Sequence, residues 1–303
     1  MVYKSVATAA FIALAIQIFA VGILAPRLPQ EVCRPGVQEL RTFTIPAAPA
    51  FRVQNSDGTV RINAGTGEEI EVTADIRAYT MTTAMDAIAT QYLSSLFQIK
   101  TDAAMVSLVT EPVERPDELD LRVDYTITLP AGSDVAVEVS NGNVWIDQGF
   151  SQITVEGNNS DIEIVRSEGP VLAKSTNGRI RLLEANAETT LETVNGNIQV
   201  GVHGGTLQAS TITGMINASL TDAGVKACDL TSLNGGITLV MPESFSAEIS
   251  ATTGRGNVRV DPVLQFSKGV SKRRTLLGVT GDGATKLSLN SMNGDIVLQR
   301  SAS

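Results

Sequence analysis

Histidine, cysteine and aromatic side chains are scarce in this sequence. Its 303 residues include one His and two Cys, and aromatic residues make up 4%. Metal sites built from His and Cys need at least three such ligands to converge, so we expect no site of this kind and no cofactor. The two thiols, Cys33 and Cys228, lie far apart in the chain, and we expect no disulfide between them.

Basic residues are outnumbered as well. The chain has 23 Lys and Arg against 32 Asp and Glu, which gives a net charge of -9 with no basic half. Nucleic-acid binding requires clustered Lys and Arg that replace counterions, so a nucleic-acid partner is excluded. An acidic balance instead suits an exported domain that stays dispersed by self-repulsion.

Charge is almost absent from the start of the chain. After Lys4, the run from Val6 to Ala25 reads VATAAFIALAIQIFAVGILA. About twenty apolar residues suffice to span a bilayer, so residues 1–25 are predicted to form a membrane anchor; cleavage as a secretory signal stays open. Residues 26–40, rich in Pro and Gly, are predicted to be a linker. We expect the rest of the chain outside the cytoplasmic membrane, held by one span, or secreted if the signal is cleaved.

A turn motif recurs at constant spacing in the remainder. Short alternating apolar and polar segments lie on both sides of each turn, as in ETVNGNIQV at residues 192–200. Successive turns are 18 residues apart and the next follows after 21, at Asn141, Asn159, Asn177, Asn195, Thr213 and Asn234. An antiparallel hairpin at each Asn-Gly is the local alternative, but a meander needs no constant coil length. We therefore predict an all-β, two-sheet parallel β-solenoid over residues 41–300, with coils of about 18 residues.

Strand parity predicts which side chains face inward. The Asn residues and the Ser or Thr two positions before them fall on the inward side, where stacked Asn amides can hydrogen-bond between coils. A second turn is expected within each coil, for example at VHGG, which begins at Val202. Cys228 takes an inward position and is predicted to be a buried, unreactive thiol.

Three segments depart from the repeat. Residues 51–79 are interpreted as one irregular first coil. Residues 82–97 have apolar side chains at helical spacing and predict a short inserted helix. Residues 261–284 have no periodicity. Because the ends of a solenoid expose unpaired strand edges, we expect the helix and the last segment to cover them.

These residues resemble a known family. The runs that carry the resemblance are YTITLPAGSDVAVEVSNGNVWI (125–146), the serial NG-I-x-V/L strands, LVMPESFSAEISATTGRGNVRV (239–260) and LNSMNGDIVLQR (289–300). They are similar to the bacterial DUF4097 family, also called "putative adhesin", over roughly residues 50–300. The resemblance implies a β-solenoid domain in or outside the cell envelope, often behind a membrane segment. It implies neither catalytic residues nor a ligand.

Few side chains are candidates for chemistry. His203 has no second His and is interpreted as a surface turn residue. A turn at Thr280, TGDGATK, is a weaker candidate for a cation site. Polysaccharide lyases with parallel β-helices gather carboxylates beside Lys or Arg on one sheet. The outward acids here form no such column: Asp147, Glu156, Asp161, Glu163, Glu184 and Glu192.

One basic cluster stands out, KGVSKRRT at residues 268–275, which we interpret as a solvated loop. A more specific interpretation is that Lys272, Arg273 and Arg274 contact a phosphate or an anionic glycan, because an Arg guanidinium can form two parallel hydrogen bonds with such groups. We therefore predict a non-enzymatic envelope protein whose solenoid presents a binding surface to a glycan or an envelope protein. The alternatives are a polysaccharide-active β-helix enzyme and a scaffold that assembles end to end.

Overall fold

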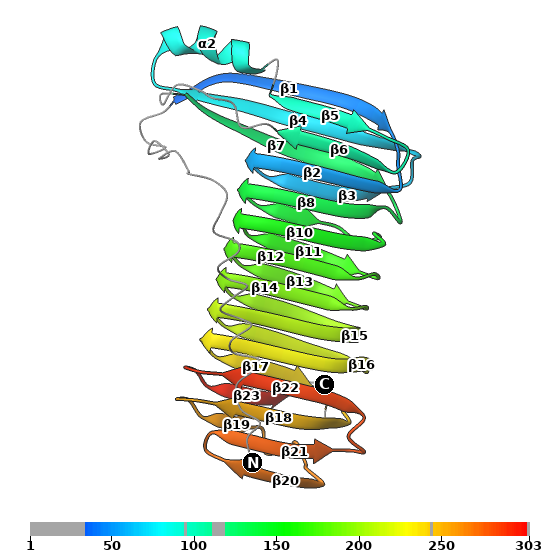
Figure 1. The fold of residues 1–303 in the computed structure, drawn as a ribbon, viewed down its shortest axis with the longest axis vertical. Coiled ribbons are helices and arrows are strands. Elements are labelled where there is room, and N and C mark those ends of the chain that lie inside the picture. The colour runs from blue at the N-terminus through cyan, green and yellow to red at the C-terminus, as the bar shows by residue number, and fades with distance from the viewer. Residues whose placement is uncertain (1–33, 94–95, 111–118, 243–244, 302–303) are drawn as a thin grey trace.

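The computed structural model describes residues 34–93, 96–110, 119–242 and 245–301. Strands wound into a stack of coils make up most of these residues, and a single helix lies at one end of the stack (Figure 1). The predicted anchor and Cys33 lie outside the described residues. Within the described part, no helix is long and apolar enough to cross a bilayer.

Sheet 1 forms one wall of the stack. Its spatial order is β5 (Phe97–Thr101), β6 (Met105–Thr110), β2 (Ala50–Asp57), β8 (Asp134–Asn141), β10 (Gln152–Asn159), β12 (Val171–Asn177), β14 (Thr189–Asn195), β15 (Ile198–Thr213), β16 (Ile216–Asn234), β22 (Thr285–Ser291), β18 (Ala247–Thr253), β21 (Thr275–Thr280) and β20 (Lys268–Lys272). The pairs β5–β6, β18–β21 and β21–β20 are antiparallel and the others are parallel, so strand direction reverses only at the two ends of this sheet.

Sheet 2 forms the opposite wall. Its order is β1 (Arg34–Pro46), β4 (Glu69–Thr80), β7 (Leu119–Pro130), β3 (Val60–Gly65), β9 (Val144–Ile146), β11 (Ile162–Ser167), β13 (Ile180–Ala185), the first halves of β15 and β16, β17 (Ile237–Met241), β23 (Ile296–Arg300) and β19 (Val258–Val260). The strands β15 and β16 bend from one sheet into the other. No second turn interrupts them at VHGG, because two register shifts there absorb the bend.

The register confirms the predicted coil length. Val135 pairs with Ile153, and the column continues at the same spacing through Val171, Thr189 and Leu207. The next partner, Cys228, follows after the predicted longer interval. The Asn-Gly motifs are therefore corners between two sheets, and the local hairpin alternative is wrong.

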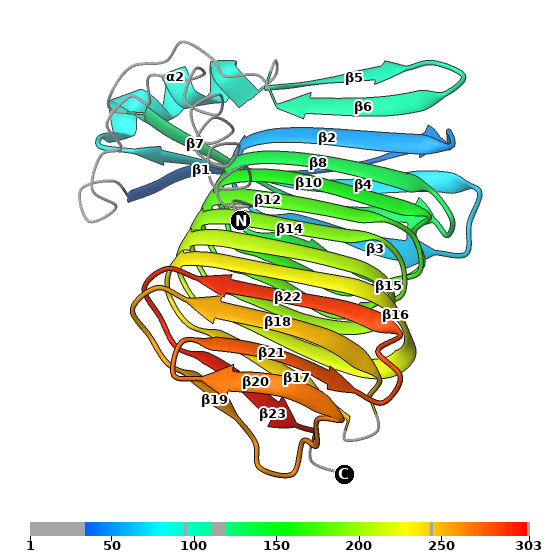
Figure 2. The same cartoon turned by 60° about the horizontal axis from the view of Figure 1, so that its bottom comes forward.

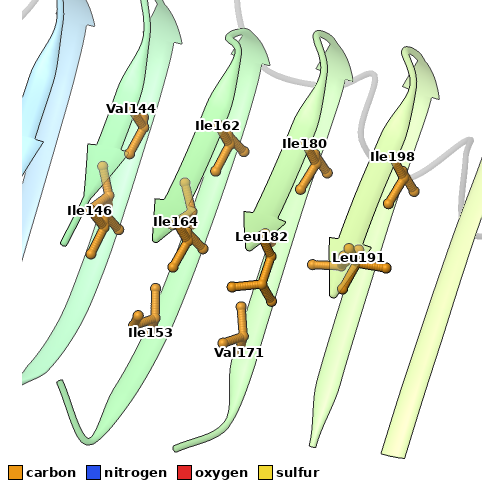
Figure 3. Packing of buried hydrophobic residues seen from close by; sticks show 14 of the residues in the cluster. Val144, Ile146, Ile153, Ile162, Ile164, Val171, Ile180, Leu182, Leu191 and Ile198 are labelled. Carbon is orange, nitrogen blue, oxygen red and sulfur yellow. The ribbon is translucent and has the colours of Figure 1, made fainter. Parts of the chain in front are cut away.

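Aliphatic side chains fill the space between the sheets. Figure 3 shows their columns, for example Val144, Ile162, Ile180 and Ile198 from successive coils, all fully buried. Each such side chain contributes about 1.5–3 kcal/mol when it leaves water. With few aromatic residues, the core is built from β-branched and Leu side chains that suit a pleated surface.

The order of coils in space differs from their order in the chain at both ends. The coil β2–β3 lies between β6–β7 and β8–β9. Likewise the last coil, β22–β23, lies between β16–β17 and β18–β19. Each terminal part of the chain is thus held one layer inside the stack.

Both predicted segments lie at the ends of the stack, but only the helix covers strands, whereas the hairpin extends sheet 1 and leaves β20 as a free edge. The helix α2 (Thr83–Leu93) packs on β1 and β4 and buries Ala89 and Leu93. At the other end the hairpin β20–β21 pairs with β18 through β21 (Figure 2). Three details differ from expectation. The segment 261–284 contains this hairpin, β1 begins inside the predicted linker, and β4 pairs with β1 and β7 outside the first coil.

The corners are held by two sets of side chains. Asn159 donates from Nδ2 to Oδ1 of Asn141 over 2.8 Å, and Asn177 repeats the bond to Asn159 over 2.9 Å. Most of these amides are exposed and only Asn141 is buried, because strand parity ends where the chain turns. Ser and Thr two positions earlier are buried, as predicted. Thr211, for instance, donates to the backbone carbonyl of Gly196 in the preceding coil, over 3.1 Å.

Candidate binding surface at the C-terminal cap

Most cations along the stack form ion pairs with carboxylates, many of them on a neighbouring coil. Arg179 meets Asp161, Arg181 meets Glu163 and Lys174 meets Glu192, with N–O distances of 3.1 to 3.2 Å. Partners in these pairs are separated by the length of one coil. Further described cations that pair with carboxylates are Arg41, Arg52, Arg77, Arg122 and Arg166.

The cations at the end of the chain behave differently. We define the C-terminal cap as residues 245–301, which form the coils β18–β19 and β22–β23 and the hairpin β20–β21. It carries eight Lys and Arg against four Asp and Glu, in a chain of net charge -9. Arg259 pairs with Asp295. Five other cap cations are exposed and form no ion pair among the described residues: Arg255, Lys268, Lys272, Arg274 and Lys286, and Arg273 bonds only to an amide.

The strand β20 gives the cap a free edge. It pairs with β21 on one side only, and all five of its residues are exposed. Lys268, Val270 and Lys272 alternate along it and therefore share one face. On that face Val270 lies directly opposite Leu277 of β21, and these two side chains are 55% and 53% exposed.

The turn between β20 and β21 holds the two arginines in place. The backbone carbonyl of Arg273 accepts from the N–H of Val258, and that of Arg274 accepts from the N–H of Thr253, each over 2.9 Å. The Arg273 guanidinium donates from Nε to Oδ1 of Asn257, also over 2.9 Å. These bonds tie the turn to the corner between β18 and β19 and leave the Arg274 guanidinium exposed. The predicted cluster Lys272, Arg273 and Arg274 is therefore brought together on ordered structure, not on a loop.

The other predicted candidates lie elsewhere and serve the structure. His203 is half-buried within β15. In the turn at Thr280, the Asp282 carboxylate accepts hydrogen bonds from the Ser246 hydroxyl and the Ala284 N–H, and the Ser246 bond contributes most to holding its pKa below the usual range. Burial, with a smaller contribution from Asp229, raises the pKa of the Cys228 thiol far above its usual range, which keeps it protonated and unreactive as predicted.

The pairing of charges along the stack was missed by sequence analysis, although a signal was present. Opposite charges stand one coil length apart at Asp161 and Arg179, at Glu163 and Arg181, and at Lys174 and Glu192. Since parallel coils bring such residues side by side, that spacing would have predicted these ion pairs.

Comparison with known proteins places the fold in a family. Residues 121–299 match the model of a family described as Toastrack DUF4097. The chain belongs to the Toastrack DUF4097 family. No curated protein matches the chain.

Solved structures are similar to this Toastrack chain at low identity. One from Bacteroides fragilis, described as a "putative adhesin", is 15% identical, with 88% of this chain and 99% of that chain covered and a TM-score of 0.44. Another "putative adhesin", from Parabacteroides distasonis, is 11% identical, with coverage of 88% and 98% and a TM-score of 0.42. A "putative lipid binding protein" from the same organism is 12% identical, with coverage of 88% and 98% and a TM-score of 0.32.

Proposed function

We propose that this protein is a non-enzymatic binding protein of the cell envelope. Residues 1–25 anchor it in the cytoplasmic membrane by one span, with the solenoid outside, or direct its secretion if they are cleaved. The solenoid acts as a rigid spacer, and the C-terminal cap binds an anionic ligand, either a charged glycan or the acidic face of an envelope protein. The sequence of residues 6–25 supports the anchor, and the unpaired cations of the cap support a role in binding.

One observation carries the proposed ligand class. Most of the exposed cations without a carboxylate partner lie on the cap, whereas cations along the rest of the stack are largely paired with carboxylates. An unpaired cation keeps its full attraction for an anion, and an Arg guanidinium matches phosphate and carboxylate groups with two parallel bonds. Lys272, Arg273 and Arg274 are the side chains that we assign to this contact.

The test measures binding of the full chain, in detergent, to immobilised long-chain polyphosphate at several salt concentrations. Lys272→Glu should weaken binding roughly fivefold or more and reduce the dependence on salt, because one phosphate contact is replaced by repulsion. Lys100→Glu is the matched control, since Lys100 is an exposed lysine on β5, the edge strand at the opposite end of sheet 1. Equal losses in the two variants would contradict the assignment of the site.

The enzyme alternative has a different signature. Acids considered for catalysis, such as Asp161, Glu163 and Glu192, are each engaged by a cation one coil away. Such pairing supports a structural role for these carboxylates. Turnover of any polyuronide by the full chain, in a screen for lyase and hydrolase products, would overturn the proposal of a non-enzymatic protein.

A further inference from the structure

Unpaired cations of the cap lie beside an exposed apolar pair. Val270 and Leu277 face each other across β20 and β21, and more than half of each side chain is in contact with water. Lys268 and Lys272 flank Val270 on the same face. A single exposed apolar side chain needs no explanation, but an exposed apolar pair flanked by lysines on one face is a combination that suggests a contact.

Neither apolar side chain has a task inside the fold. The core beneath the hairpin is supplied from the other face of β21, where Leu276 is 2% exposed and Phe266 lies against Gly278. Other positions on the same outer face carry threonine, since β21 and β18 place Thr275 opposite Thr252 there. A polar β-branched side chain is therefore sufficient at a solvent-exposed position of this sheet. Threonine has the same β-branched shape and strand preference as valine without the loss of contact with water.

We infer that the cap docks on a bilayer surface that contains anionic lipid. This inference rests on the proposed function, because it uses the same contact with anionic groups, and it names lipid headgroups as the ligand in place of a glycan or a protein face. A soluble polyanion would engage the lysines but would leave Val270 and Leu277 in water. A bilayer surface satisfies both, because apolar side chains enter the boundary between headgroups and acyl chains while Lys and Arg bind the anionic headgroups.

The position of the hairpin allows this docking. β20 is the free edge of sheet 1, so no neighbouring coil prevents a flat surface from approaching it. Lys268 and Lys272 stand four residues apart, about 13 Å along the strand. Additional cations lie further across the sheet. Lys286 on β22 lies beside Glu248 on β18 in the strand register, and Lys226 lies in the adjacent coil, on β16. Glu248 is the acidic residue among these cations.

The docking surface also lies far from the first described residues. Sheet 1 runs from β5 to β20 through twelve strand spacings of about 4.8 Å, which is roughly 60 Å. β1 is at the β5 end of the stack (Figures 1 and 2). A protein anchored through residues 1–25 and docked through β20 would therefore span the gap between two membrane surfaces.

The experiment uses the full chain in nanodiscs of phosphatidylcholine, so that the N-terminal apolar segment is already occupied. Binding to immobilised vesicles is measured, with phosphatidylcholine alone or with roughly one third phosphatidylglycerol added. We expect binding only to the anionic vesicles. Val270→Ser/Leu277→Ser, which keeps every charge, should weaken it about tenfold, while polyphosphate binding stays unchanged.

The control is Met215→Ser/Leu233→Ser, which removes two exposed apolar side chains outside the cap and should leave vesicle binding unchanged. Binding of polyphosphate without binding of anionic vesicles would overturn the inference and leave the proposed function standing. So would vesicle binding that is insensitive to Val270→Ser/Leu277→Ser. Failure to bind either probe would overturn the proposed function as well.

Discussion

At the scale of single residues, the corner glycines show why the repeat motif is Asn-Gly. The structure gives Gly142 and Gly214 a positive φ, yet Gly196 has an ordinary one. A Cβ on Gly196 would stand 1.9 Å from the backbone carbonyl oxygen of Gly178 in the preceding coil. Close stacking of backbones therefore selects glycine there, in addition to the conformational freedom that sequence analysis invoked.

Gly196→Ala should consequently destabilise the protein by about 1–3 kcal/mol, because neither backbone can move without disturbing the coils on both sides. Urea unfolding followed by circular dichroism measures this difference. Gly67→Ala provides the comparison, since the nearest atom to its added Cβ would be 3.9 Å away and the expected change lies within about 0.5 kcal/mol. Similar values for the two variants would show that the corners tolerate side chains.

Tyr125 makes stability depend on alkaline pH. Its ring is buried between the sheets, and its hydroxyl lies 2.7 Å from the Thr110 hydroxyl. Burial raises the pKa of Tyr125 to about 12 from an unfolded value of 10.0. Because the pKa is higher in the folded state, the neutral phenol of Tyr125 makes its full contribution to the free energy of unfolding below pH 10. That contribution is lost as pH rises through 12.

Tyr125→Phe removes that dependence. At pH 8 the variant should be less stable by about 1 kcal/mol, because the Thr110 hydroxyl loses its partner. Between pH 10 and 12 the wild type should lose roughly 3 kcal/mol relative to the variant, so the two stability curves should cross. Unfolding free energies from urea titrations across this range test the prediction. A constant difference between the two proteins would refute it.

At the scale of secondary-structure elements, both outer strands of sheet 1 are short and carry lysine. β5 presents Lys100, and β20 presents Lys268 and Lys272. Lysines on an edge strand oppose pairing with another chain, and two copies stacked end to end would bring lysines together. This arrangement argues against the scaffold that assembles through its ends.

Removal of these charges should therefore promote association. Lys268→Thr/Lys272→Thr keeps strand preference on β20 and leaves its open backbone groups unguarded. We expect a concentration-dependent shift from monomer to dimer or larger species in analytical ultracentrifugation of the full chain in detergent. Wild type that associates as strongly as the variant would show that the lysines do not guard this edge.

The elements that sequence analysis predicted well are those with a repeated pattern. The alternation of apolar and polar residues on both sides of each corner Asn predicted the strands of the regular coils. The constant spacing of those Asn residues predicted how the strands pair. The hairpin β20–β21 was missed because Gly269 and Gly278, which pair with each other, interrupt the alternation. The start of β1 was missed because Pro35 and Gly36 suggest a linker, although proline is tolerated where an edge strand begins.

The candidate site was only partly visible in the sequence for a related reason. The cluster Lys272, Arg273 and Arg274 is contiguous and could be read directly. The other unpaired cations include Lys286 on β22 and Arg255 in the bend after β18, and their place on the cap depends on the position of β22 beside β18. Whether a cation lacks a partner likewise becomes clear only when the order of coils is known.

At the scale of the whole molecule, the two ends of the stack differ in charge and in cover. At the end with β1, β4 and α2, arginines are engaged by carboxylates, as in the pairs of Arg41 with Glu39 and Arg77 with Asp75. The opposite end is the cap, where cations exceed acids. A stack of coils keeps these two ends apart at a fixed separation, which a flexible linker could not do.

The interleaved order of coils has a mechanical consequence. A force applied at the N-terminal side of the described chain would first strip β1 from β4 and would then reach β2–β3, which neighbours clamp on both sides. Withdrawal of that coil must break four ladders at once, whereas a coil at an open end would detach one hydrogen bond at a time. Tension from the other terminus meets the same obstacle at β22–β23. The protein should therefore resist unfolding by force applied at either end of the described chain, as a load-bearing tether would require.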